Sequence, residues 1–291
     1  MITTEVLNGG FVRLVRSMGG DESVVEAARV TSGTLTDTHG ERRPARDLIR
    51  FLMRHEHMSP FEFCQLEFHV RAPIYVARQW VRHRTASWNE VSARYVEVKD
   101  DYQRQETWRG QAKSNRQGSE GEVEYEPRGI DDHGRDLWMK TAEEFALVEY
   151  NERIKAGVAR EQARTCLPVS TWTEWRWSVD LRNCLHFLGL RASPHAQPEI
   201  RAYAEAMIPM VESVAPFSVE AWRDYRQNAL TLTAMDLKAI AQTRAWDDPP
   251  RHTILEGITR RTVIELAQNE LGIPVVERSI DRSEVYLCDE L

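Results

Sequence analysis

Long hydrophobic runs and an excess of positive charge are both missing from this 291-residue sequence. No run approaches the roughly 18 apolar residues that span a bilayer, and the first residues, MITTEVLNGG, lack the regions of a signal peptide. We therefore expect a cytoplasmic protein with no membrane partner. A net charge of −7 argues against general nucleic-acid binding, because proteins that bind nucleic acids usually carry a basic domain.

Cysteine is also scarce, and the four cysteines are scattered without a CxxC pair: Cys64, Cys166, Cys184 and Cys288. This spacing indicates neither a disulfide framework nor a zinc site, so we expect free thiols and no metal. P-loop and GxGxxG motifs are missing as well. The hydrophobic content of 42% can supply the core of one large domain or of two small ones.

Positive charge is instead concentrated in one stretch, QWVRHRTASWNEVSAR, at residues 79–94. Before its middle, Gln79, Arg82 and His83 have the i, i+3, i+4 spacing that places side chains on one helical face. Such a cationic cluster in an acidic protein suggests an anion site, since a guanidinium matches phosphate oxygens in pairs. A solvated basic helix end is the alternative.

The second part of this stretch changes its period. If residues 90–94 are extended, Glu90, Ser92 and Arg94 project to one side and Val91 and Ala93 to the other. One face would then offer a carboxylate, a hydroxyl and a guanidinium. The following residues, 95–98, are a further strand candidate.

Helices and strands are expected to alternate along the rest of the chain. Alternating apolar residues predict a strand near 64–70, and aromatic and β-branched residues predict one near 171–179. Capping residues and apolar spacing predict helices from Asp21 to about 32, after Pro44, from Asp180, over about 197–210 and over about 218–227. A long amphipathic helix is expected over 136–159, with apolar positions at Leu137, Ala142, Phe145, Val148 and Ile154.

The spacing of Arg82-His83-Arg84, seven residues and then Ser92 resembles the signature of the flavin-dependent thymidylate synthases. The resemblance covers about residues 6–238. It implies that dUMP is methylated to dTMP with 5,10-methylenetetrahydrofolate and NADPH through bound FAD. It also implies an α/β (α+β) fold, with a curved mixed sheet flanked by helices, and a homotetramer whose sites are shared between subunits.

Matching motifs carry the family's cofactor contacts onto this sequence. The segments HEHMSPFE, RHR and DLRNCLHFL resemble flavin-contacting segments of the family. The resemblance implies FAD contacts from Thr31, Ser59, Arg82, His83, Arg84, Glu90, Asp180, Arg182 and His186. Family members often carry a histidine where this chain has Phe63.

The same resemblance implies a dUMP site. Its implied residues are Gln79, Arg82, Glu90, Ser92, Arg94, Arg164 and Arg191. In LRASPHAQ, Arg191 stands where the family uses a catalytic arginine to polarise the uracil. From the residues alone, a salt bridge from Arg164 to Glu161 or another carboxylate is the alternative for that position.

Residues 99–132 are rich in charge, Gly, Gln and Ser. A segment of this length without periodicity is either disordered or a functional lid. Trp108, Arg109 and residues 115–119 resemble a family loop near the active site, which favours a lid.

Residues 246–291 form the last expected unit, after a synthase-like domain over 1–245. About 40 of them resemble a fragment of the class IV, branched-chain-type aminotransferases. The region that supplies the Schiff-base lysine of those enzymes is missing, and the nearest lysine, Lys238, lies in the synthase-like part. We expect no pyridoxal phosphate chemistry here. For the whole chain, a nucleotide or nucleic-acid binding module without catalysis is the alternative function.

Overall fold

The computed structural model describes residues 2–32, 43–99, 101–113, 118–125, 129–130, 136–137, 141–230 and 234–236. The side chains of 31–32, 129–130 and 136–137 are outside the described part. The chain divides into two compact units, Met1–Ala229 and Leu230–Leu291. The elements expected within 246–291 lie outside the described residues, so everything below concerns the first unit.

A five-stranded sheet in the order β1-β2-β3-β9-β4 is the centre of this unit. Its strands are β1 Ile2–Val6, β2 Gly10–Met18, β3 Gln65–Pro73, β4 Ser87–Glu90 and β9 Trp172–Asp180. All four neighbouring pairs are antiparallel. The expected combination of helices and strands is confirmed. The expectation of a mixed sheet is wrong, because every strand of this sheet runs antiparallel to its neighbours.

The two central strands were predicted from the sequence, and both are confirmed. Leu66, Phe68 and Val70 of β3 are buried on one face, and Trp175 and Trp177 of β9 are buried beside them. The residues between them remain half-buried. Period-two alternation therefore assigned the core face of β3 correctly, whereas the content of aromatic and β-branched residues predicted β9 without assigning its core face.

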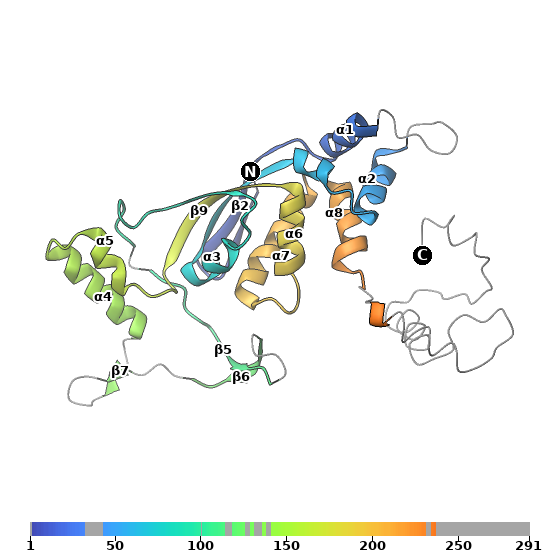
Figure 1. Ribbon diagram of the computed structural model, residues 1–291. Helices are drawn as coiled ribbons and strands as arrows, with labels where there is room; N and C mark the ends of the chain where they lie inside the picture. Colours follow the sequence, from blue (N-terminus) through green and yellow to red (C-terminus); the bar gives the residue numbers. More distant parts are fainter. Residues whose placement is uncertain are drawn as a thin grey trace, which may run out of the picture. The chain divides into compact units, whose positions relative to one another are not determined.

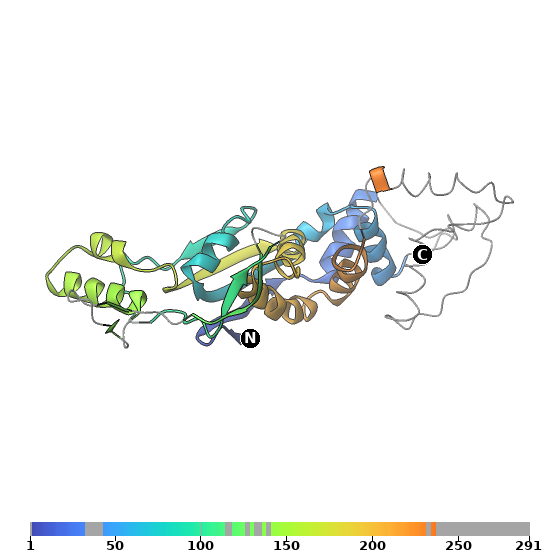
Figure 2. The same ribbon diagram turned by 90° about the horizontal axis from the view of Figure 1, so that it is seen from below.

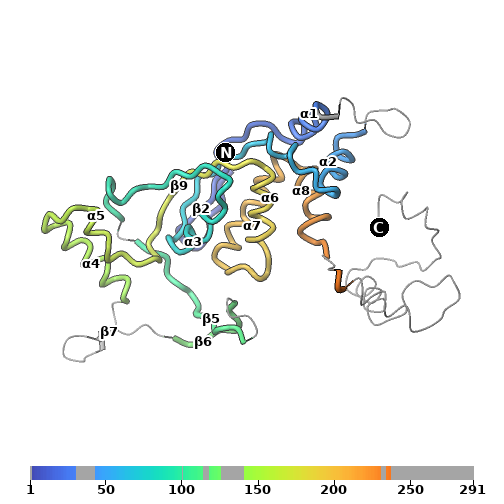
Figure 3. Tube along the Cα trace, viewed as in Figure 1, coloured from blue at the N-terminus to red at the C-terminus, as the bar shows by residue number. Residues whose placement is uncertain are grey.

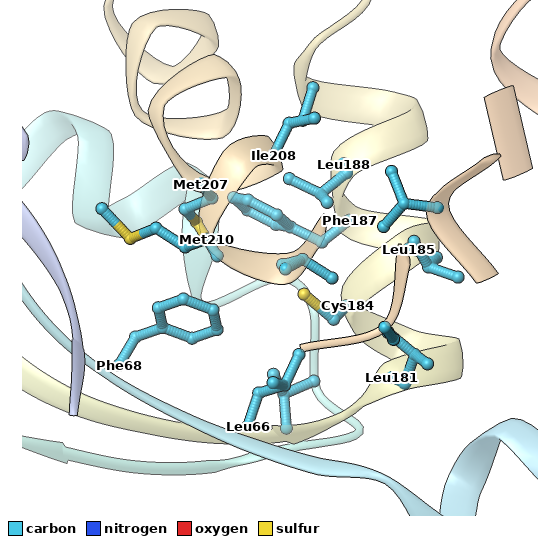
Figure 4. Close-up of a cluster of buried hydrophobic side chains, with 14 of the residues drawn as sticks. Leu66, Phe68, Leu181, Cys184, Leu185, Phe187, Leu188, Met207, Ile208 and Met210 are labelled. Carbon is cyan, nitrogen blue, oxygen red and sulfur yellow. The ribbon is translucent and has the colours of Figure 1, made fainter. Parts of the chain in front are cut away.

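Three helices cover the core face: α3 Ile74–Trp80, α6 Leu181–Arg191 and α7 Pro198–Glu212 (Figure 1). Figure 4 shows apolar side chains of α6 and α7 meeting Leu66 and Phe68 of β3. The predicted helix from Asp180 is confirmed, because the Asp180 carboxylate accepts from Asn183 N at 2.9 Å and caps α6. The cap therefore makes Leu181 the first residue of α6.

A second group of helices packs beyond this layer: α1 Asp21–Ser32, α2 Ala45–Arg54, η1 Ser59–Phe63 and α8 Pro216–Trp222, which continues as η3 Arg223–Gln227. Figures 1 and 2 both show α1, α2 and α8 side by side. The buried carboxylate of Asp21 joins them by accepting from Ser218 N at 3.0 Å and Ser218 Oγ at 2.6 Å. The predicted helix from Asp21, the helix after Pro44 and the helix near 218 are thus confirmed.

The middle of the chain forms two small antiparallel pairs and a short helical region. The pairs are β5 Trp108–Gln111 with β6 Ser119–Val123, and β7 Gly129–Ile130 with β8 Asp136–Leu137. The helices are α4 Ala142–Lys155 and α5 Arg160–Ala163, both traced in Figure 3, and η2 Arg164–Cys166. No helix among the described residues is both long and apolar enough to cross a membrane.

The expected long helix over 136–159 is wrong at its start and in its buried face. Thr141 caps α4 in a reciprocal capping box with Glu144, so the helix begins later than expected. Leu147 and Tyr150 are its buried side chains, while Phe145 and Val148 are exposed. Tyr150 is held inside because its hydroxyl accepts from Val98 N at 3.0 Å. Spacing alone could not select this face, since apolar residues surround the helix.

Candidate active site

A cavity of about 460 Å³ is lined by the segment after α3, by β9 and by α6. We call it the His83 cavity, and its principal lining residues are Arg82, His83, Arg84, Trp177, His186 and Arg191. Its size is within the usual range of ligand pockets. No carboxylate lines it among the described residues, and Arg82 and Arg84 form no ion pair with any described residue. The cavity is therefore suited to an anion.

Arg82 and His83 enter this cavity from a turn, not from a helix. The helix α3 ends at Trp80, where Val81 N donates to Ala77 O at 2.9 Å and His83 N donates to Trp80 O at 3.0 Å. The expectation that Gln79, Arg82 and His83 share one helical face is wrong. The buried Trp80 ends the helix against Phe187, and the chain must then reverse to start β4 at Ser87.

Arg191 is fixed by two hydrogen bonds in this cavity. Its Nε donates to Nε2 of His83 at 3.0 Å, and its Nη2 donates to the carbonyl oxygen of Gln79 at 3.3 Å. Burial lowers the pKa of Arg191, but a guanidinium remains charged at neutral pH. The Nη1 group has no further partner among the described residues, so a bound molecule can receive its hydrogen bonds.

His83 is neutral in this arrangement. Burial, then the charge of Arg191 and then His186 lower the pKa of His83 to about 4. Its Nε2 therefore accepts from Arg191, and the proton is assigned to Nδ1. The rings of His83 and His186 lie 6.1 Å apart between centroids. The two histidines, which the resemblance implied for FAD, and Arg191, which it implied for dUMP, thus line the same cavity.

A second cavity, of about 570 Å³, holds other residues implied by the resemblance. We call it the Ser92 cavity, and its lining includes Arg71, Glu90, Ser92, Arg164, Trp172 and Glu174. Glu90 Oε1 accepts from Thr173 Oγ1 at 2.6 Å. Arg71 Nη2 donates to Asp101 Oδ2 at 3.1 Å. Cations and carboxylates are mixed here, in contrast to the His83 cavity.

The extended conformation expected for residues 90–94 is wrong after its first two residues. β4 ends at Glu90, and Val91 N makes one further ladder bond to Glu174 O at 2.8 Å. Ser92 then begins a turn, because its carbonyl oxygen accepts from the amides of Tyr95 and Val96 at 2.9 and 3.1 Å. The strand expected over 95–98 is therefore also wrong.

Arg94 consequently does not act from the same face as Ser92. Its backbone amide donates to Ser92 Oγ at 3.3 Å, while its exposed guanidinium lies 3.4 Å from Glu161. Glu161 is the carboxylate that the sequence offers to Arg164, but Arg94 is the arginine that it contacts. Of the three residues expected to share one face, only Glu90 and Ser92 line the Ser92 cavity.

Other residues implied for FAD binding lie at the N-terminal end of α6 and on η1. Asp180 caps α6, and Arg182 Nη1 donates to Glu62 Oε1 at 2.5 Å. Ser59 is exposed at the start of η1, and Phe63 is exposed at its end. The side chain of Thr31 is outside the described part. None of these described residues lines the His83 cavity or the Ser92 cavity.

The sequence matches the family model described as thymidylate synthase complementing protein over residues 13–217. The chain belongs to this family. The matched range includes both cavities and every residue assigned from the resemblance, so the recognition of a thymidylate synthase family is confirmed.

Similar proteins agree with this assignment. A flavin-dependent thymidylate synthase of Thermus thermophilus is 44% identical over 272 residues, which are 94% of this chain and 92% of that protein. One of Treponema pallidum is 44% identical, over 81% of this chain and 76% of its own. Among solved structures, the UMP/dUMP methylase PolB of Streptomyces cacaoi bound with 5-Br dUMP matches at a TM-score of 0.63 and 36% identity. That match covers 77% of this chain and 99% of PolB.

Sequence reasoning missed several residues that line the cavities of this thymidylate synthase family member. Asn183 and Leu190 line the His83 cavity, and Arg71 and Glu174 line the Ser92 cavity. Alternation continued one residue beyond the predicted strand 64–70 would place Arg71 on the polar face of β3. The pairing of Arg71 with Glu174 across the two strands depends on register, which the sequence did not reveal.

Proposed function

We propose that this protein is a flavin-dependent thymidylate synthase that converts dUMP to dTMP with 5,10-methylenetetrahydrofolate and NADPH through bound FAD. The His83 cavity carries this proposal. Arg82 and Arg84 have no ion-pair partner among the described residues, and Arg191 is held beside a neutral histidine. The names of the Thermus and Treponema relatives support the flavin and the product.

The residues of the His83 cavity fit the groups that the proposal requires. The phosphates of a nucleotide or of FAD need cationic partners, which Arg82 and Arg84 supply. Arg191 would point Nη1 at a uracil carbonyl and favour the polarised ring, because a fixed cation stabilises developing negative charge. The neutral His83 keeps Arg191 in place without adding a competing charge. When bound, the flavin would supply the reducing electrons.

The assembly is proposed to be a homotetramer with shared sites. Five of the seven residues implied for dUMP line two cavities, with Arg82 and Arg191 in one and Glu90, Ser92 and Arg164 in the other, while Gln79 and Arg94 line neither. Along the chain, the strand β4 connects residues 82–85, which line the His83 cavity, to residues 90–93, which line the Ser92 cavity. A strand of four residues extends about 13 Å. One chain would thus offer two incomplete half-sites, which neighbouring subunits could combine.

Complementation tests this sharing. Arg191→Ala and Arg164→Ala each damage one cavity, and both variants are expected to be inactive as pure proteins. If two subunits share each site, mixed oligomers regain activity toward about a quarter of the wild-type value, because some sites combine two intact halves. Mixtures that stay inactive after subunit exchange would show that each chain carries a complete site.

The compartment is proposed to be the cytoplasm. Cys64, Cys166 and Cys184 are free thiols, which is usual in reducing compartments.

Burial raises the pKa of the Cys64 thiol to about 12, so this cysteine is not poised as a nucleophile.

Two alternatives differ from the proposal in measurable ways. PolB is named a UMP/dUMP methylase and was also crystallised with 5-Br UMP, so UMP is a second candidate substrate. Product analysis with dUMP and UMP in competition distinguishes the two substrates.

A nucleotide-binding module without catalysis would bind no flavin. The purified protein should therefore be yellow, with bands near roughly 370 and 450 nm that belong to the cofactor. A colourless protein that FAD cannot load would contradict the proposal.

A further inference from the structure

An ion pair between the partly exposed Arg109 and the buried Glu199 links the β5–β6 hairpin to the start of α7. Glu199 is 3% exposed, and its Oε1 accepts from Arg109 Nη2 at 2.6 Å. Burial alone would raise the pKa of Glu199, but hydrogen bonds from Arg109 and Gln197 hold it below its usual value. A buried carboxylate of this kind is costly unless it is paired. Separation of Arg109 from Glu199 would leave the carboxylate buried without a cation, so the pair favours a hairpin that stays next to α7.

The same carboxylate is linked to the His83 cavity by a chain of hydrogen bonds. Glu199 Oε2 accepts from Gln197 Nε2 at 2.8 Å, and Gln197 Oε1 accepts from Gln79 Nε2 at 2.5 Å. The carbonyl oxygen of Gln79 accepts from Arg191 Nη2 at 3.3 Å. The chain thus reaches Arg191, whose Nε is held by His83. These bonds fix the orientation of both side-chain amides. Gln197 donates from its nitrogen to Glu199 and accepts with its oxygen from the side-chain nitrogen of Gln79.

We propose that Glu199 is a positioning residue that anchors the β5–β6 hairpin through Arg109 and orients Arg191 in the His83 cavity through Gln197 and Gln79. The effect on turnover rests on the proposed function, since Arg191 is assigned there to the nucleotide. The anchoring and the orientation of Arg191 stand on the observed contacts alone. The position of the β5–β6 hairpin and the orientation of Arg191 in the His83 cavity would then both depend on the buried Glu199 carboxylate.

The anchoring half is tested by hydrogen exchange on the full-length protein. Arg109→Ala should raise the exchange rates of the amides of β5 and β6 by about tenfold or more, because the bond to the buried Glu199 carboxylate no longer opposes local opening. Arg104→Ala is the matched control, since Arg104 lies on the same segment, is exposed and faces Glu144 at 3.7 Å. Unchanged exchange in Arg109→Ala, or an equal increase in Arg104→Ala, would overturn the anchor.

A double variant checks that the buried charge is the cause. In Arg109→Ala the Glu199 carboxylate is left buried without its cation, whereas Arg109→Ala with Glu199→Gln removes both charges. The double variant should therefore be more stable than Arg109→Ala alone. A double variant that loses the sum of both single effects would contradict a shared pair. Arg109→Lys, which keeps the charge, should restore most of the wild-type exchange protection.

The orientation half has a readout that needs no enzymatic activity. Gln197→Ala breaks the chain between Glu199 and Gln79 but leaves the Arg109–Glu199 pair. If Arg191 then moves, the pKa of His83 should rise, because the imidazole loses the cation and the hydrogen bond that favour its neutral form. The charged or titratable groups that remain around His83 are His186, Arg82 and Arg84. The titration is followed by NMR of labelled histidines, with His83→Asn to assign the signal.

The kinetic consequence separates this inference from the proposed function. Gln197→Ala should lower kcat for dUMP about tenfold with a smaller change in KM, because small displacements of a positioned group mainly affect the transition state. Its hairpin exchange should equal that of the wild type. An unchanged His83 pKa in Gln197→Ala, or unchanged turnover in an active enzyme, would overturn the inference. A wild type that converts no dUMP would refute the proposed function, while exchange and titration would still decide the anchoring and the orientation.

Discussion

Arg191 and His83 are 108 residues apart in the sequence, and Nε of Arg191 donates a hydrogen bond to Nε2 of His83 across 3.0 Å. The bond joins the end of α6 to the turn after α3. It requires a neutral imidazole, and burial together with Arg191 provides one by lowering the pKa of His83 to about 4. Arg191 thus enters the His83 cavity in a defined orientation with Nη1 available.

Removal of Arg191 should affect the reaction more than the fold. We expect Arg191→Ala to fold, to retain flavin and to lose about 100-fold or more in kcat, the scale of removing one electrostatic donor. Arg46→Ala is a suitable control, because the exposed Arg46 pairs with Glu220 outside both cavities. Near-normal turnover of dUMP by Arg191→Ala would refute the role of this arginine.

The neutral state of His83 predicts a pH dependence of stability. The folded-state pKa of about 4 is below the ordinary value of 6.5, so between these values the unfolded chain binds a proton that the folded chain does not. The free energy of unfolding should therefore fall as the pH drops from about 6.5 to about 4. The loss should be at most about 2 kcal/mol, because His83 is only half-buried and solvent screens it.

Urea unfolding from pH 7 to pH 4 measures this loss, with His83→Gln as the comparison. Gln cannot be protonated in this range, and its oxygen can still accept from Arg191. The difference in stability between the two proteins should change with pH in the stated window. Parallel curves would mean that His83 titrates normally in the folded protein.

Arg94 is predicted to hold the dUMP phosphate, and its contact with Glu161 adds a condition. Arg94→Ala should raise the KM for dUMP, whereas Glu161→Gln should lower it by up to about fivefold. The reason is that an exposed ion pair worth up to about 1 kcal/mol would no longer compete for the guanidinium. Steady-state kinetics on both variants provide the check. A KM that neither variant changes would show that the phosphate lies elsewhere.

Local signals in the sequence predicted much of the fold. Asp180 was correctly expected to start α6, because an N-cap bonds to residues three positions away. Alternation likewise assigned the buried face of β3. The buried face of α4 was not predictable, since Tyr150 is selected over Phe145 by the long-range contact with Val98.

The candidate site was predicted as a set of residues but not as an arrangement. The arginine-rich motif singled out Arg82, His83 and Arg84 as a candidate anion site, and all three line one cavity. The end of α3 and the turn at Ser92 depend on where β4 joins β9, which is a long-range pairing. The Arg109–Glu199 pair, 90 residues apart, had no local signal at all.

The tail from 246 to 291 is predicted to be dispensable for synthase chemistry. Every residue assigned to FAD or dUMP precedes residue 192, and the family model ends at 217. A chain ending at Trp246 should thus keep its flavin content and form dTMP within a few-fold of the full chain. Loss of activity in a soluble, correctly assembled truncation would contradict this. The intact chain is also expected to bind no pyridoxal phosphate, and stoichiometric binding of that cofactor would show a role for the tail.

Anaerobic conversion of dUMP by the purified, FAD-loaded protein tests the central claim most directly. With NADPH and 5,10-methylenetetrahydrofolate present, the proposed function requires dTMP to appear in proportion to the NADPH consumed. Omission of dUMP should stop product formation, and Arg191→Ala should slow it about 100-fold. NADPH oxidation without any dTMP, or methylation of UMP in preference to dUMP, would contradict the assignment.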